Sequence, residues 1–314
     1  MKISVIGAGA MGSLFGGKLS LNGIDVVLYD INKAHVDRIN SNGLSIEESS
    51  TGETLKAYPL ASSNPQDVQG SDLMIVFVKS TATDSVARQF VKYAKEKTIV
   101  LTLQNGLGNE DILRKHFGEH RTAAGVTSQG ATFLEPGKIR HAGSGPTHIC
   151  MSDKNNGKLT DIVNAFTESG FEIDIAENIA DLVWSKLIIN VGINAVTALS
   201  GLENGKILEY PELKSLMADL VGEAVKVAQE KGVKLSYPDP VQIVYDVSEK
   251  TALNRSSMLQ DFDRGSMTEI DFINNAIVRE GAKLGIDTPY NSLITKLVKS
   301  MELINRERKA AGAQ

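Results

Sequence analysis

The chain has 314 residues, enough for two domains, and an ordinary composition of 42% hydrophobic and 23% charged residues. Its formal net charge of −5 argues against nucleic acid or an anionic membrane as a partner. The single cysteine, Cys150, excludes an internal disulfide, and no uninterrupted run of about 18 apolar residues marks a membrane span. We therefore expect a soluble, cytoplasmic protein.

The first 30 residues predict a strand, a glycine turn, a helix and a second strand. Residues 2–6 (KISVI) are β-rich, GAGAMG occupies 7–12, a segment with helical periodicity ends near Gly23, and 25–30 (DVVLYD) is again β-rich. This order is the βαβ unit of a dinucleotide-binding fold, and GAGAMG fits G-x-G-x-x-G.

Each glycine of that turn has a physical reason. Gly7 permits the tight turn, Gly9 lets the backbone approach a pyrophosphate, and Gly12 allows close packing of helix on strand. With Ala10 and Met11 they are the predicted phosphate-binding residues, at a helix N-terminus that favours negative charge. The alternative is a glycine-rich turn without a ligand.

Asp30, at the end of the second strand, predicts which dinucleotide binds. A carboxylate there accepts hydrogen bonds from a ribose diol and repels a 2′-phosphate. Asp30 could instead cap the next helix, although Asn32 could take that role, and Lys33 or Arg38 could reach a phosphate. We expect NAD to be preferred, with NADP possible.

The remaining elements divide the chain near residue 176. Alternating strands and helices predict a parallel sheet with helices on both faces in a Rossmann-type domain, 1–176, whose glycine-rich stretch after 125 forms hairpins that close the sheet. Residues 177–314 are almost entirely helix-periodic and predict an all-α domain that could form a homodimer. The predicted strands are 72–79, 98–106 and 171–176, and the predicted helices are 83–97, 158–169, 179–200, 211–232, 239–250, 265–285 and 291–310.

Two polar residues follow predicted strands, at the sheet edge where such folds bind ligands. Lys79 could contact the phosphates or ribose of a nucleotide, or it could be a solvated lysine at a strand end. Asn105 lies in LQNG, where Asn-Gly is also a common turn dipeptide.

Lys186, Asn190 and Asn194 form a polar stripe in the apolar segment WSKLIINVGINAV. Their four-residue spacing places them on one helical face. Burial without partners would cost several kcal/mol, so the stripe favours a lined cavity over a snorkelling lysine. A partly desolvated lysine has a lowered pKa and suits proton donation and stabilisation of an alkoxide.

Glu269 lies among apolar residues in 254–277 and is a plausible counter-ion for Lys186, although a surface acid is the default interpretation. His116 and His120 are four residues apart, but Gly118 between them disfavours a helix and no third ligand is evident. We therefore predict no metal site.

In this order and spacing, the motifs resemble those of the ketopantoate reductase (2-dehydropantoate 2-reductase) family along nearly the whole chain. The resemblance implies a Rossmann-type domain followed by a helical domain like that of 6-phosphogluconate dehydrogenase. The matching landmarks are GAGAMG, VKS at 78–80, QNG at 104–106, K-x3-N-x3-N at 186–194, Asn204, and SSMLQD with TEID at 256–271.

The resemblance also implies residue roles. Lys186 would protonate the substrate oxygen as hydride arrives from nicotinamide, Asn105 would lie near the nicotinamide and the substrate carbonyl, and Glu269 would hold the lysine network or a substrate hydroxyl. Lys79 would contact the nucleotide, and Ser257 would bind the substrate carboxylate. The substrate pocket would be lined by Asn190, Asn194 and Asn204.

One position departs from the family pattern. NADP-linked members usually carry an arginine just past the second strand, and here that position is Ile31, preceded by Asp30. The leading hypothesis is reduction of a branched 2-oxo acid to the (R)-2-hydroxy acid, with ketopantoate as the first substrate. The family's NAD-linked D-2-hydroxyacid dehydrogenases, similar to D-mandelate dehydrogenase, are the alternative.

Two hypotheses come from other classes. A dinucleotide-sensing protein without catalysis would call for an apolar residue at position 186. A 3-hydroxyacid or polyol-phosphate dehydrogenase would call for clustered arginines in the helical domain, where Arg255, Arg264 and Arg279 are the candidates.

Overall fold

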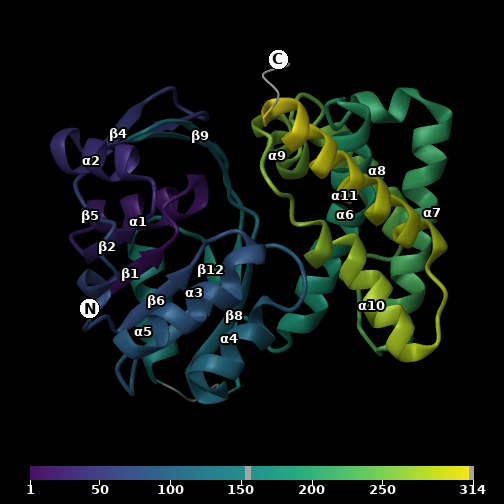
Figure 1. Cartoon of the computed structure of the whole chain (residues 1–314). Coiled ribbons are helices and arrows are strands. Elements are labelled where there is room, and N and C mark those ends of the chain that lie inside the picture. The colour runs from purple at the N-terminus through teal and green to yellow at the C-terminus, as the bar shows by residue number, and fades with distance from the viewer. Residues whose placement is uncertain (153–156, 311–314) are drawn as a thin grey trace. The chain divides into compact units, whose positions relative to one another are not determined.

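The computed structural model describes residues 1–152 and 157–310. It divides into two compact units, shown in Figure 1: Met1–Gln104 with Asn109–Ile179, and Asn105–Gly108 with Ala180–Gln314. The first unit is an α/β domain and the second is helical. The short segment Asn105–Gly108 follows strand β7 (Ile99–Thr102) in the chain but belongs to the second unit.

The main sheet of the first unit has the strand order of a Rossmann fold. Its first six strands, β5-β2-β1-β6-β7-β8, are all parallel, and the order matches 3-2-1-4-5-6. β11 then pairs antiparallel with β8, and β12 pairs parallel with β11. The strands other than β7 are β1 (Lys2–Ile6), β2 (Asp25–Tyr29), β5 (Leu60–Ser62), β6 (Leu73–Val76), β8 (Thr122–Thr127), β11 (Thr147–Met151) and β12 (Ile173–Ile175).

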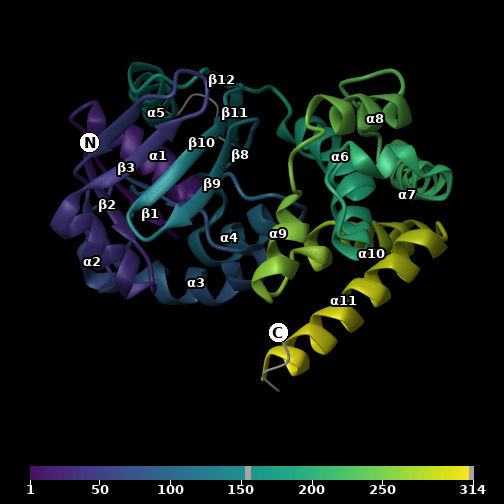
Figure 2. The same ribbon diagram turned by 90° about the horizontal axis from the view of Figure 1, so that it is seen from above.

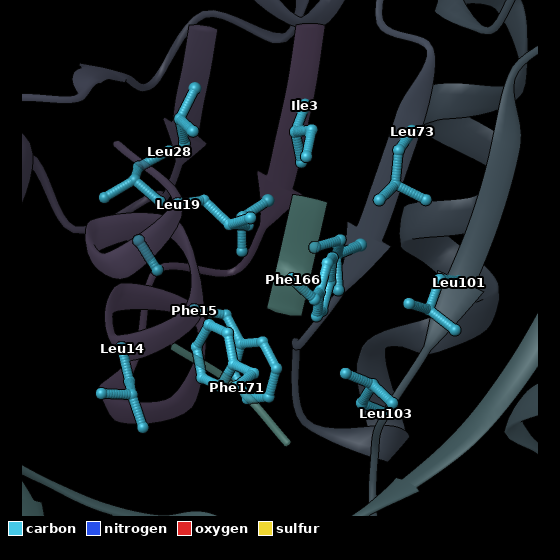
Figure 3. Close-up of a cluster of buried hydrophobic side chains, with 14 of the residues drawn as sticks. Ile3, Leu14, Phe15, Leu19, Leu28, Leu73, Leu101, Leu103, Phe166 and Phe171 are labelled. Carbon is cyan, nitrogen blue, oxygen red and sulfur yellow. The ribbon is translucent and has the colours of Figure 1, made fainter. Parts of the chain in front are cut away.

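Helices cover both faces of this sheet. On one face, Phe15 of α1 (Ala10–Leu21) stacks on Phe171 with ring centroids 4.4 Å apart and also contacts Phe166 of α5 (Gly157–Glu168), as Figure 3 shows. On the other face, α3 (Thr83–Phe90) and α4 (Asn109–Phe117) bury Phe90 and Phe117. The predicted helix 83–97 is too long. The α-helix ends at Phe90, and a 3₁₀ turn, η3 (Val91–Tyr93), follows it.

A second, four-stranded sheet corrects the prediction that hairpins close the main sheet. The β8–β11 pair does extend the main sheet, but β9 (Gly130–Glu135) and β10 (Lys138–Gly143) join β3 (Leu44–Glu48) and β4 (Thr54–Ala57) in a separate sheet (Figure 2). α1 packs closely on β3 of this second sheet, since a Cβ at Gly17 would lie 2.8 Å from Ile46 Cδ1. The strands β3 and β4 were not predicted.

In the second unit, α6 (Ile179–Ser200) contributes Trp184, Leu187, Ile188 and Val191 to a core that it shares with residues of the other helices. The predicted helix 265–285 is wrong in its first half. Gly265 ends α9 in the left-handed conformation with φ +63°, and α10 begins only at Asn274. The helices besides α6 are α7 (Pro211–Glu230), α8 (Pro240–Lys250), α9 (Ser257–Arg264), α10 (Asn274–Leu284) and α11 (Pro289–Ala310).

Buried polar side chains fix the helix ends in this unit. The Glu223 carboxylate accepts hydrogen bonds from the backbone N–H groups of Tyr290 and Asn291, at 2.8 and 2.9 Å, and so caps the start of α11. The Asn291 amide donates to the Leu220 carbonyl at 3.0 Å and ties α11 to α7.

α6 is also, by length and composition, long and apolar enough to cross a membrane. Its best 18-residue window has a mean hydropathy of 1.5, and 67% of that window is buried within the protein. Packing as a core helix accounts for its apolar character.

Candidate active site

The predicted nucleotide-binding residues lie along one edge of the main sheet. β7, β6, β1 and β2 are adjacent and parallel, so their carboxyl ends share that edge. The GAGAMG turn follows β1, Asp30 follows β2 and Lys79 follows β6. This is the edge, at the reversal of strand order, where open α/β sheets bind ligands.

The three glycines of the turn differ in whether the fold leaves space for a side chain at their positions. Gly7 has φ +97°, and a Cβ there would lie 2.8 Å from the Val78 backbone nitrogen. A Cβ at Gly12 would lie 2.0 Å from the Gly7 carbonyl oxygen. Gly9 is exposed, has an ordinary φ of −62° and would meet nothing within 4 Å. The fold explains Gly7 and Gly12, whereas the open space at Gly9 fits close approach of a ligand to the backbone.

The glycine turn is held from behind by two buried side chains that the sequence did not suggest. Ser13 Oγ donates to the Ala8 carbonyl at 2.7 Å and contacts His35 Nε2 at 3.1 Å. His35 Nδ1 accepts from the Gly137 N–H at 2.9 Å. Burial lowers the pKa of His35, so the neutral ring, with its proton on Nε2, fits these contacts.

Asp30 does not cap the following helix. Asn32 does so, since its side chain accepts from the His35 N–H at 3.2 Å at the start of α2 (Lys33–Asn42). Asp30 Oδ1 accepts from the Asn32 N–H at 2.8 Å, and Oδ2 accepts no hydrogen bond from a described residue. One carboxylate oxygen therefore remains available to a ligand.

The side chains of Ile31, Lys33 and Arg38, which follow Asp30 in the chain, have different surroundings. Ile31 is 82% exposed and Lys33 is also exposed. The stem of Arg38 packs against the β9–β10 turn, where a Cβ at Gly137 would lie 2.3 Å from Arg38 Cγ.

Lys79 and Asn105 fall in different units. Lys79 is exposed and begins the 3₁₀ turn η2 (Ser80–Ala82) of the first unit. Asn105 opens the segment Asn105–Gly108 of the second unit, where the Leu107 N–H donates to the Phe272 carbonyl at 2.9 Å. Gly106 has φ +86°, and a Cβ there would lie 2.4 Å from the same carbonyl oxygen. Asn105 is thereby held beside η6 (Ile270–Phe272), the turn that directly follows Glu269.

The polar stripe of α6 is present as the spacing predicts. Lys186, Asn190 and Asn194 follow one another at successive turns of the helix, and Asn194 is only 5% exposed. Among the residues that the structure describes, none exchanges a hydrogen bond with the Asn190 or Asn194 amide. Neither amide belongs to the fully buried atoms that lack a partner, so both keep access to solvent or a ligand.

Lys186 is half-buried, and the low polarity around its ammonium dominates its electrostatics. Burial lowers the pKa of Lys186 to about 8, and the negative charge of Glu269 partly offsets the effect. Glu269 is 7% exposed, so the acid that the sequence left as a surface residue by default is buried and acts on the lysine. A lysine with this pKa can release and recover a proton near neutral pH.

Asn204 contributes a buried acceptor without a donor. Its Nδ2 donates to Thr251 Oγ1 at 2.9 Å, and Thr251 Oγ1 donates its own proton to the Val247 carbonyl at 2.7 Å. The hydroxyl can therefore only accept from Asn204, which fixes the orientation of the amide. Asn204 Oδ1 is then buried with no partner among the described residues, a costly state that a ligand donor would relieve.

The two serines of SSMLQD separate into different roles. Ser256 is buried, caps α9 by accepting from the Leu259 N–H at 3.1 Å, and accepts from Thr197 of α6 at 2.7 Å. Ser257 is exposed in the first turn of α9, where a hydroxyl and free helix N–H groups suit a carboxylate. The structuring role of Ser256 was not apparent from the sequence.

Comparisons with known proteins cover almost the whole chain. The family models "Ketopantoate reductase PanE/ApbA" and its C-terminal counterpart match residues 3–154 and 178–302. A 2-dehydropantoate 2-reductase of Pyrococcus horikoshii is 37% identical over 303 residues, 96% of this chain and 98% of that protein. One of Halobacterium salinarum is 35% identical over 300 residues, 95% of this chain and 98% of that protein.

Solved structures give the same result. A PanE/ApbA family ketopantoate reductase from Ralstonia eutropha matches with a TM-score of 0.90 at 34% identity, covering 98% of this chain and 100% of that one. A ternary structure of D-mandelate dehydrogenase with NADH and anilino(oxo)acetate also gives a TM-score of 0.90, at 30% identity and the same coverage.

The glycine turn generates a prediction about two alanine substitutions. Gly9→Ala should preserve the thermal midpoint but weaken dinucleotide binding about tenfold or more, because the new methyl group occupies the space that a pyrophosphate needs. Gly12→Ala should instead lower the thermal midpoint, since its methyl group collides with the Gly7 carbonyl. Thermal melts and NADH fluorescence titrations measure both effects. Unchanged NADH affinity in Gly9→Ala would contradict a phosphate-binding role.

Proposed function

The chain belongs to the ketopantoate reductase family, and from that premise we propose that it reduces a branched 2-oxo acid to the (R)-2-hydroxy acid, with ketopantoate as the substrate. The reaction consumes the 2-oxo acid, NAD(P)H and one proton and yields the 2-hydroxy acid and NAD(P)⁺. When bound, the nicotinamide supplies the hydride to C2. The partly buried Lys186, with its pKa near 8, is the observation that carries this proposal.

Lys186 acts as the general acid. Its ammonium donates a hydrogen bond to the C2 carbonyl oxygen, stabilises the negative charge that develops there, and transfers a proton to it. Burial alone would lower the pKa of Lys186 further. The negative charge of Glu269 raises it, so that more of the lysine stays protonated. Asn105, which precedes the Gly106–Leu107 contact with Phe272 of η6, orients the carbonyl from a second direction.

The amide groups of the second unit favour a substrate that carries a hydroxyl group. Asn190 and Asn194 offer both donors and acceptors, and the orphaned Oδ1 of Asn204 needs a donor. The terminal hydroxyl of ketopantoate supplies one, whereas benzoylformate, the oxidised form of mandelate, has none. Ser257, exposed at the start of α9, takes the substrate carboxylate.

NADH is the proposed cofactor. Asp30 Oδ2 is available to the ribose diol, and Ile31 stands where NADP-linked members of the family carry an arginine. The D-mandelate dehydrogenase relative, whose structure contains NADH, is consistent with this choice. The same relative favours an alternative, in which this chain acts as a D-2-hydroxyacid dehydrogenase on substrates without the terminal hydroxyl.

Two other classes fit the structure less well. A phosphate-bearing substrate would need arginines at the site, but Arg255 forms a bidentate pair with Asp263 and Arg279 donates to the Asp271 carbonyl. A dinucleotide sensor without catalysis would not need a partly desolvated lysine beside a buried carboxylate. For the reductase we propose a cytoplasmic location, where NADH and 2-oxo acids are available.

The proposed acid role of Lys186 generates a prediction about catalysis and its pH dependence. Lys186→Ala should lower kcat for 2-oxo acid reduction by about 10²–10⁴-fold, because the proton donor is lost. In the unchanged enzyme, reduction should slow as pH rises through about 8 and Lys186 loses its proton, whereas oxidation of the hydroxy acid should accelerate. Lys226→Ala, which removes an exposed lysine of α7, is the control. Near-normal turnover in Lys186→Ala at an intact fold would exclude this acid.

The choice of substrate can be tested with two 2-oxo acids that differ by a single oxygen atom. 3,3-Dimethyl-2-oxobutanoate equals ketopantoate without the hydroxyl oxygen, and its kcat/KM should be about 10- to 100-fold lower because Asn204 Oδ1 stays unsatisfied. In Asn204→Ala, the ratio of kcat/KM for ketopantoate to kcat/KM for 3,3-dimethyl-2-oxobutanoate should fall towards one. A kcat/KM for benzoylformate above that for ketopantoate would instead support the D-mandelate type.

The cofactor proposal predicts a preference for NADH that one substitution weakens. Ile31→Arg should raise kcat/KM for NADPH about tenfold or more, because it adds a 2′-phosphate partner at a position that is 82% exposed and tolerates the change. Ile31→Ala is the control for loss of the apolar side chain alone. If the unmodified enzyme strongly prefers NADPH, the assignment of NAD is wrong.

A further inference from the structure

Buried and half-buried polar side chains join the two turns that follow β6 and β7. Gln104 Nε2 donates to the Val78 carbonyl at 2.7 Å and to Thr83 Oγ1 at 2.9 Å. Asn109 Oδ1 accepts from Thr83 Oγ1 at 2.9 Å, and Asn109 Nδ2 donates to Ser80 Oγ at 3.0 Å. The contacts therefore reach the residues on either side of Lys79, and they come from residues that flank the segment Asn105–Gly108.

The directions of the hydrogen bonds named above follow from their donors and acceptors. The Val78 carbonyl can only accept, so the Gln104 amide nitrogen must face it. Thr83 Oγ1 accepts from that same nitrogen and consequently gives its own proton to Asn109 Oδ1, which turns the Asn109 nitrogen towards Ser80. On the other side, Thr102 Oγ1 donates to Gln104 Oε1 at 2.9 Å. Thr83 is the central member because it alone both accepts from Gln104 and donates to Asn109.

Three members of the network are shielded from water, whereas Gln104 is half-buried. Thr83 is 0% exposed, Ser80 is 1% and Asn109 is 3% exposed. In such surroundings an unmade hydrogen bond leaves a polar atom unsatisfied, so the members hold one another in a single arrangement.

We infer that Gln104, Thr83 and Asn109 form a positioning clamp, which fixes the backbone of the Lys79 turn against the strand end that leads into Asn105. The clamp acts through Lys79, the proposed nucleotide contact, and through the anchoring of both ends of the Asn105–Gly108 segment, so this inference rests on the proposed function of those two residues.

The experiment compares two buried threonines of the first unit. Thr83→Val keeps the side-chain shape and removes the hydroxyl that accepts from Gln104 and donates to Asn109. Thr98→Val is the matched control. Thr98 is 1% exposed, accepts from the Lys95 N–H at 2.9 Å and donates to the Ser71 carbonyl at 2.7 Å, but it precedes β7 at the opposite edge of the sheet. Thr83→Ser restores the hydroxyl.

Three quantities are measured on the full chain: the thermal midpoint, the Kd for NADH and NADPH by fluorescence titration, and kcat with KM for the cofactor using ketopantoate. Both valine variants should lower the thermal midpoint similarly. Only Thr83→Val should raise the Kd and KM of the preferred dinucleotide, by about tenfold, because its turn shifts. Thr83→Ser should recover most of that loss.

Equal dinucleotide affinities in Thr83→Val and Thr98→Val would overturn the inference, since the hydroxyl would then serve stability alone. A Thr83→Ser variant as impaired as Thr83→Val would also overturn it. If the unmodified protein turns over no 2-oxo acid, the proposed reaction fails. The titrations still decide on the clamp in that event, because NADH binding requires no substrate.

Discussion

Lys186 lies on a helix whose other faces are apolar, and the loss of water around its ammonium lowers its pKa to about 8. That desolvation opposes folding unless other groups offset it. Glu269 does so by charge, and the contact of Gly106 and Leu107 with Phe272 holds the adjoining turn against η6. A buried ammonium whose pKa is shifted by desolvation and by a nearby carboxylate is typical of a functional site, which supports the acid role proposed for Lys186.

Local patterns were sufficient for the first part of the fold. The strand, glycine turn and helix at the N-terminus are predictable because Gly7 and Gly12 satisfy constraints between residues close in the chain. The small sheet was not predictable in the same way. β3 pairs in parallel with β10, nearly a hundred residues later in the chain, and its Ile46 packs against Gly17 of α1. No periodicity within one segment records such a contact.

The helical unit shows a related limit. Apolar spacing across 265–285 suggested one helix, but the chain turns at Gly265 and passes through η6 before α10 begins at Asn274. That irregular stretch carries Glu269 and the carbonyl that receives the Leu107 N–H. A continuous helix would have tied the Phe272 carbonyl into its own hydrogen bonds, so the break in the helix between α9 and α10 leaves this carbonyl free to accept from Leu107.

The spacing of Lys186, Asn190 and Asn194 was enough to place them on one face, but the hydrogen-bonding state of a side chain depends on partners that spacing cannot show. Asn204 is the clearest case: the orientation of its amide follows from Thr251, which donates elsewhere. Two hydrogen-bond networks differ in whether every buried donor and acceptor has a partner. Around Thr83 the donors and acceptors match one another, so the network holds its own geometry. Around Asn204 one buried acceptor is left over, and only an additional donor completes it. The matched network suits the positioning role inferred for Thr83, and the unmatched acceptor suits the substrate contact proposed for Asn204.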